Sequence, residues 1–149
     1  KMMKRVLILF VFLINSCGYQ PIYIGIDKNE TIFKKIILTG DKKINRRIVS
    51  TIALKEDINH KTENEITFFS QKKINETSKD SKGNVVSYKM TINLNTKIKT
   101  SETVKERSFS KSFSYNNKDN KFDLNEYQNQ IEKNIIDEII RDLIIFIKL

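Results

Sequence analysis

The sequence predicts an α+β protein, a two-layer sandwich in which two helices cover one mostly antiparallel or mixed sheet in the order βαβββα. Three observations carry this prediction. The chain has 149 residues, about one domain, with 39% hydrophobic and 30% charged residues. Its middle part alternates apolar and polar residues with period two, as in a half-buried strand. Two further segments repeat apolar residues every three or four positions, as in amphipathic helices.

The domain is expected to cover residues 32–149 and to begin with a strand and a helix. Residues 32–38 are rich in β-branched and aromatic side chains and predict a short strand in the same sheet as the later ones, ending at residues 39–41. An amphipathic helix is predicted over residues 43–54. Its apolar face repeats every four residues and consists of Ile44, Ile48 and Ile52, with Val49 beside them.

Three strands are predicted next. Residues 65–75 form the first, and the turn around Gly83, where a positive φ is convenient, joins it to the second in a hairpin. The second has the clearest alternation, with an apolar face of Tyr88, Met90, Ile92, Leu94 and Ile98.

The third strand is expected over residues 104–115, with aromatic side chains in phase at Phe109, Phe113 and Tyr115. Lys111 has the same parity as these aromatics. A bulge, an edge position or a polar contact would each explain a lysine there, and the sequence does not choose among them.

The last segment is the strongest helix signal. Asp123 and Glu126 resemble a capping box, and Asp137 and Arg141 have the spacing of an i,i+4 ion pair. Core packing is favoured over a helix that lies on a membrane, because the helix also carries Glu132, Glu138 and Asp142. Its wide apolar side consists of Leu124, Tyr127, Ile131, Ile135, Ile136, Ile139, Ile140, Leu143, Ile144, Phe146 and Ile147.

The composition disfavours several classes of function. One cysteine, Cys17, forms no internal disulfide and no multi-cysteine zinc site. The only histidine, His60, lies in a polar run, and the four glycines are too scattered for a phosphate-binding loop. An exported hydrolase is therefore disfavoured, and we expect no enzyme, no cofactor and no metal. The net charge of +9 suits anionic partners without identifying one.

The amino-terminal residues predict export. Lys4 and Arg5 precede a nine-residue apolar run, residues 6–14, which is too short to cross a bilayer and has the layout of a signal peptide. We assign residues 1–16 to this signal and residues 17–31 to a lipidated cysteine and tether. Because an exported, anchored domain does not meet chromosomal DNA, no nucleic-acid partner is expected.

Cys17 follows Ile14, Asn15 and Ser16, and this run resembles the lipobox of bacterial lipoproteins. The resemblance implies cleavage before Cys17, an S-diacylglycerol and an N-acyl chain such as palmitate on that residue. Asn15 is bulkier and more polar than the usual lipobox residue. Several acyl chains would hold the protein to a membrane almost permanently.

The signal, the run Cys17-Gly18-Tyr19-Gln20-Pro21-Ile22-Tyr23, the βαβββα order and the closing helix together resemble LptE, the lipopolysaccharide-assembly lipoprotein family, and most closely its alphaproteobacterial members. The resemblance implies an outer-membrane lipoprotein on the periplasmic side. It would sit in the lumen of an LptD-type β-barrel, help that barrel assemble and assist insertion of lipopolysaccharide at the outer leaflet.

Candidate contacts to lipopolysaccharide phosphates are basic residues on the predicted second and third strands: Lys89, Lys97, Lys99, Lys105 and Arg107. A solvated, lysine-rich face is the competing explanation for these residues. The alternative function is a free-standing, lipid-anchored periplasmic module that binds lipid without a barrel partner.

Overall fold

The computed structural model describes residues 31–148. Along the chain these residues form β1 (Thr31–Phe33), β2 (Lys35–Gly40), α2 (Lys42–Ile52), β3 (Leu54–Glu56), β4 (Asn64–Lys79), β5 (Val85–Thr100), β6 (Val104–Asn116) and α3 (Lys121–Lys148). The signal peptide predicted for residues 1–16, Cys17 and the tether up to residue 30 lie outside the described residues. Among those described, no helix is both long enough and apolar enough to span a bilayer.

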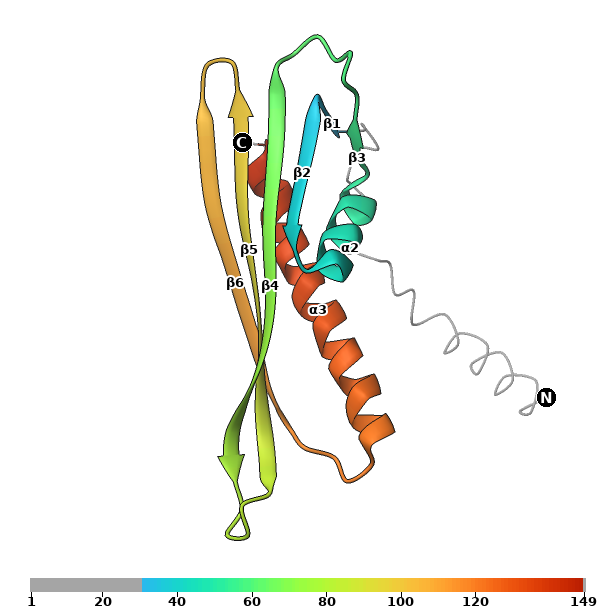
Figure 1. The fold of residues 1–149 in the computed structure, drawn as a ribbon, viewed down its shortest axis with the longest axis vertical. Coiled ribbons are helices and arrows are strands. Elements are labelled where there is room, and N and C mark those ends of the chain that lie inside the picture. The colour runs from blue at the N-terminus through green and yellow to red at the C-terminus, as the bar shows by residue number, and fades with distance from the viewer. Residues whose placement is uncertain (1–30, 149) are drawn as a thin grey trace, which may run out of the picture.

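Four strands make one mixed sheet in the order β2-β4-β5-β6. Strands β4, β5 and β6 form an antiparallel meander, and β2 pairs parallel with β4, so that Ile36 lies beside Ile66. Helices α2 and α3 pack against the sheet and against each other (Figure 1). The predicted α+β two-layer sandwich is confirmed.

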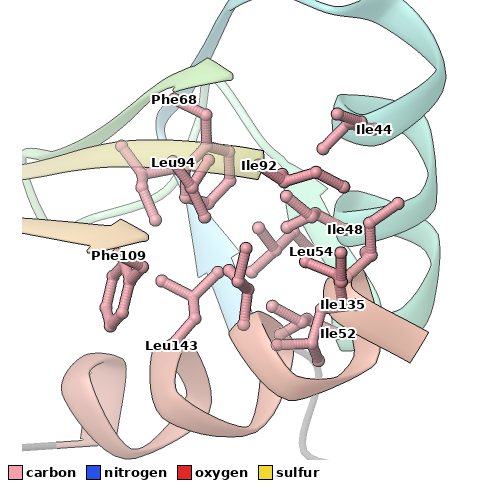
Figure 2. Close-up of a cluster of buried hydrophobic side chains, with 14 of the residues drawn as sticks. Ile44, Ile48, Ile52, Leu54, Phe68, Ile92, Leu94, Phe109, Ile135 and Leu143 are labelled. Atoms are coloured by element: carbon pink, nitrogen blue, oxygen red, sulfur yellow. The ribbon is translucent and has the colours of Figure 1, made fainter. Parts of the chain in front are cut away.

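The core lies between the helices and one face of the sheet, which we call the inner face. Figure 2 shows Phe68, Ile92 and Leu94 of the sheet meeting Ile48 of α2 and Leu143 of α3. The period-two pattern predicted this face correctly, because the even-numbered apolar residues of β5 from Met90 to Leu94 are almost completely buried. The wide apolar side predicted for the last helix is likewise the side that the sheet covers.

The first predicted strand is two strands. Residues 32–38 were expected to form one continuous element, but the chain bends at Lys34, where the backbone N–H donates to the backbone oxygen of Asn64 at 3.0 Å. As a result, β1 pairs parallel with β3, in a separate two-stranded sheet, while β2 joins the main sheet. The sequence analysis missed β3, because three residues with one buried side chain give no periodicity.

The helix starts also differ from expectation. The side chain of Asp41 accepts hydrogen bonds from the backbone N–H groups of Lys43 and Ile44, which starts α2 one residue early. At α3, the Asn120 side chain accepts the Phe122 N–H at 2.8 Å, so Asn120 and not Asp123 caps the helix. The capping-box prediction for Asp123 and Glu126 is therefore wrong.

Candidate functional site

The face of the main sheet that points away from the helices, here called the open face, is mostly polar. Strand register places there the alternate residues of each strand that do not contribute to the core. The large apolar members of this face are Ile37 of β2, Phe69 of β4 and Val104 of β6, and 44% of the surface of Phe69 is exposed. The polar members include Lys35, Glu65, Thr67, Gln71, Lys73, Lys89, Thr91, Asn93, Asn95, Lys97, Lys99, Glu106, Ser108, Ser110, Ser112 and Ser114.

Two of the candidate phosphate contacts, Lys97 and Lys99, lie together at one end of the open face. Lys97 Nζ is 2.7 Å from Glu106 Oε1, so part of its charge is already paired. Both groups are exposed, and such a pair contributes little stability because water screens it. Lys99 is next to Glu65 in the register and is exposed. A shallow hollow of about 230 Å³ beside Lys97 is lined in part by Phe69.

Lys89 is also exposed on the open face but is far from this pair. It lies eight residues before Lys97 on the same strand, a separation of about 26 Å at the usual rise per residue. The open face therefore carries a spread of cations and not one concentrated patch.

The other two candidates, Lys105 and Arg107, are on the inner side of the sheet. Register pairs Lys105 with Ile98 and Arg107 with Thr96, and both partners have core parity. The Arg107 guanidinium carbon lies 5.4 Å from the ring centre of Phe109 and 6.0 Å from that of Phe146, which are cation–π distances. Register thus assigns these two residues to the opposite face from Lys89, Lys97 and Lys99, although Arg107 also lines the hollow beside Lys97.

Lys111 is an edge residue with a polar contact. It lies on β6, at the end of the strand order, and its Nζ is 3.1 Å from Asp142 Oδ2 of α3. The register of β5 and β6 is continuous there, which excludes a bulge and leaves the other two explanations together.

One charged cluster inside the molecule was not predicted. Glu132 of α3 is only 3% exposed and accepts ion pairs from Lys72 Nζ of β4 at 2.7 Å and from Lys43 Nζ of α2 at 2.9 Å. Burial by itself raises the pKa of Glu132, but the hydrogen bonds and charges of Lys72 and Lys43 outweigh it, and the pKa is lowered. The sequence contained a signal for this cluster. Lys72 has the same parity as Ile66 and Phe68, which places a lysine on the inner face of the sheet.

The predicted pair of Asp137 with Arg141 is replaced by a contact between helices. Asp137 Oδ1 accepts from Arg47 Nη2 of α2 at 2.9 Å and from Arg47 Nε at 3.3 Å. This contact and the Glu132 cluster fix α2 beside α3.

His60 lies in the turn after β3, where its Nδ1 is 3.3 Å from the backbone nitrogen of Thr62. Among residues 31–148, no three histidine, cysteine or acidic side chains are arranged to hold a metal ion.

An apolar groove at the β2 edge of the sheet was also not predicted. It has a volume of about 710 Å³ and lies between β2, α2 and β3. Leu38, Val49, Ala53 and Leu54 supply its apolar walls. The size is typical of a pocket for a small molecule.

No protein-family model matches the sequence, and no curated protein matches it either. Solved structures do resemble the fold. The rare lipoprotein B of Shewanella oneidensis has a TM-score of 0.60 and 9% identity, over 76% of this chain and 93% of that one. A lipoprotein B of Nitrosomonas europaea has a TM-score of 0.50 and 12% identity, over 76% of this chain and 81% of that one. The described domain therefore has a fold similar to that of bacterial lipoproteins of the rare lipoprotein B type, an LptE-like fold.

Proposed function

We propose that this chain is a lipid-anchored outer-membrane lipoprotein of the LptE type, the subunit of a lipopolysaccharide translocon that occupies an LptD-type barrel. The observation that carries the proposal is the likeness of fold to rare lipoprotein B, because it extends over 93% of that lipoprotein's chain. The signal-like residues 1–16 and the lipobox-like run that ends at Cys17 support it independently, since they concern another part of the sequence.

The open face suits this role. The interior of a large membrane β-barrel is polar, so a plug needs a surface that remains favourable beside polar walls and trapped water. The serines at alternate positions of β6 and the amides of β5 provide such a surface, and among the described residues Phe69 is the one aromatic side chain on it. The job is one of binding and shaping, with no catalytic group assigned.

The deciding experiment is affinity purification of a carboxyl-terminally tagged protein from detergent-solubilised outer membranes, with mass spectrometry of stoichiometric partners. We expect one large β-barrel at about one-to-one stoichiometry, because a plug and its barrel form a stable unit. A second tagged lipoprotein from the same membrane is the control. Recovery of a clean monomer would contradict the proposal and would favour the free-standing lipid-binding module.

A second test addresses the anchor. Cys17→Ala removes the only thiol that an acyl chain can be attached to, so the protein is expected to leave the membrane fraction or to accumulate with its signal uncleaved. Cys17→Ser is a matched variant that also lacks the thiol and should behave in the same way. Unchanged fractionation of both variants with the outer membrane would exclude lipidation as the means of attachment.

A third test concerns lipopolysaccharide. Lys89 and Lys99 are exposed on the open face, and the double variant Lys89→Glu/Lys99→Glu is expected to weaken binding of purified lipopolysaccharide about tenfold or more, as loss of charge-assisted contacts to phosphate does. The control Lys133→Glu/Arg141→Glu makes the same change of net charge on exposed residues of α3. An equal loss in both variants would show general attraction of charge and no contact at the open face.

A further inference from the structure

The groove at the β2 edge exists because the main sheet and the small β1–β3 sheet are separate. Strand β2 is an edge strand of the main sheet, and β3 pairs with β1 instead of extending that sheet. Ala53 ends α2 in the left-handed conformation, with φ 55°, and turns the chain into β3. Helix α2 therefore packs on the inner face through Ile44 and Ile48, while its flank at Val49 faces the groove.

The walls of the groove are apolar and partly exposed. Leu38 of β2 keeps 43% of its surface accessible, although its register neighbour Phe68 is fully buried. Val49 and Leu54 complete the apolar floor. An apolar surface of this size that stays in water is unfavourable, and a ligand chain that displaces the water is stabilised in proportion to the area it buries.

The rim of the groove is cationic. Lys42 and Arg46 of α2 both line it and are both exposed, and Lys55 lines it from β3. Within residues 31–148, neither Lys42 nor Arg46 is paired with a carboxylate. Among the described residues, no acidic side chain lines the groove, and Glu56, next along β3, accepts the backbone N–H of Ile36 at 2.7 Å. An occupant that neutralises Lys42 and Arg46 must therefore be an anion.

We propose that this groove is a binding site for a single acyl chain with an anionic headgroup, such as a lysophospholipid. The acyl chain of the ligand lies against Leu38, Val49 and Leu54, and Lys42 and Arg46 contact its headgroup. A lone phosphate ion satisfies the rim but leaves the floor in water, and a neutral chain does the reverse. The site is distinct from the open-face lysines and requires neither the lipid anchor nor the barrel of the proposed function.

The test is photo-crosslinking of the full chain by palmitoyl lysophosphatidylglycerol that carries a diazirine in the acyl chain, at a concentration below micelle formation, with peptide mapping by mass spectrometry. The same photoreactive chain on lysophosphatidylcholine is the zwitterionic comparison. We expect label on the peptides of β2, α2 and β3, and excess inorganic phosphate should not displace it. Label spread over the chain in proportion to exposed apolar surface would overturn the proposal.

Two variants test the contacts to the acyl chain and the contacts to the headgroup separately. Ser50→Trp places an indole at the exposed edge of the groove and is expected to reduce labelling of these peptides about tenfold with both probes. Lys42→Glu/Arg46→Glu is expected to abolish the preference for the anionic probe, a change of about tenfold, because two cations become anions. Lys133→Glu/Arg141→Glu is the control with the same residue types and should change neither quantity.

Leu38→Gln, which makes the apolar surface of the groove polar, is the second blocking variant. It is used if circular dichroism shows that Ser50→Trp does not fold. Unchanged labelling in whichever blocking variant is folded would exclude the groove. Loss of the preference for the anionic probe in the α3 control as well would exclude the cationic rim. Recovery of the barrel does not depend on either result, so this inference and the proposed function can fail separately.

Discussion

Glu132 is a carboxylate that holds three elements together. It comes from α3, and its two lysine partners come from β4 and α2. Removal of one member of a buried ion pair is costly, because the remaining charge loses its partner without regaining full hydration. Here Lys72 and Lys43 both reach solvent, so their loss of a partner is partly offset by water.

Glu132→Gln is expected to lower the free energy of unfolding by about 1–3 kcal/mol at pH 7, since an amide keeps the shape but not the charge. Urea unfolding followed by circular dichroism measures this. Glu138→Gln, at an exposed position of the same helix, is the control and should change stability by less than about 0.5 kcal/mol. Equal effects of the two variants would contradict a special role for Glu132.

The same variant has a pH dependence with a defined sign. The pKa of Glu132 is lowered in the folded protein from an ordinary value of 4.5, so its ionised form stabilises the fold above that value. This contribution decreases as the pH falls from about 4.5 through the lowered pKa. The difference in stability between the native chain and Glu132→Gln should therefore be constant near neutral pH and shrink in acid. A difference that grew in acid would contradict the assignment.

Gly40 and Gly83 are a natural pair for testing backbone strain. Both have positive φ, 86° and 84°, but an added Cβ at Gly40 would lie 1.9 Å from the backbone oxygen of Ser70, whereas at Gly83 nothing lies within 4 Å. Gly83→Ala is expected to cost about 1 kcal/mol from conformation alone. Gly40→Ala should cost about 2–4 kcal/mol, because a clash between β2 and β4 is added. Thermal unfolding of the two variants measures the difference, and similar costs would contradict it.

At the scale of elements, the predictions that held are those with a long period. The second strand of the meander and the last helix each repeat their pattern over many residues, so that one discordant side chain does not obscure the face. The predictions of short elements were wrong because such elements are too short to repeat a pattern. The division between β1 and β2 depends on one bend at Lys34 and on hydrogen bonds to Asn64, a residue 30 positions away, and no local pattern reports such a contact.

Helix α3 provides a prediction at this scale. Ile140 is completely buried and Ile145, five residues later, is 58% exposed. Ile140→Ala is expected to cost about 2–5 kcal/mol, from the lost transfer free energy and the cavity left in the core. Ile145→Ala should change the free energy of unfolding by less than about 0.5 kcal/mol. Chemical denaturation of both variants is the measurement, and a large effect of Ile145→Ala would instead show that this residue is covered in solution.

At the scale of the whole molecule, the candidate site was predicted only in part. The positions of the basic residues along their strands were correct, but the faces depend on how β5 and β6 align. Leu94 pairs with Phe109, so odd-numbered residues of β6 share the inner side with even-numbered residues of β5. The aromatic parity of β6 places Lys105 and Arg107 with Phe109, a signal that the sequence analysis did not use. The groove could not be predicted from the sequence, because its shape depends on how β2, α2 and β3 pack together.

The tip of the hairpin of β4 and β5 extends past the start of α3 (Figure 1). Beyond Ser70, strand β4 pairs only with β5, whereas β5 pairs with β6 as far as Ser87. Beyond Lys72 the side chains of β4 are exposed, and the register shifts between Glu76 and Lys79. Backbone amides of residues 77–86 should exchange with solvent deuterium much faster than those beside Phe68, because these residues contribute no side chain to the core. The distal end of this hairpin can thus open and re-form while the sandwich stays folded. Its tip at residues 80–84 is accordingly the place where a short peptide tag can be inserted at little cost to the global stability.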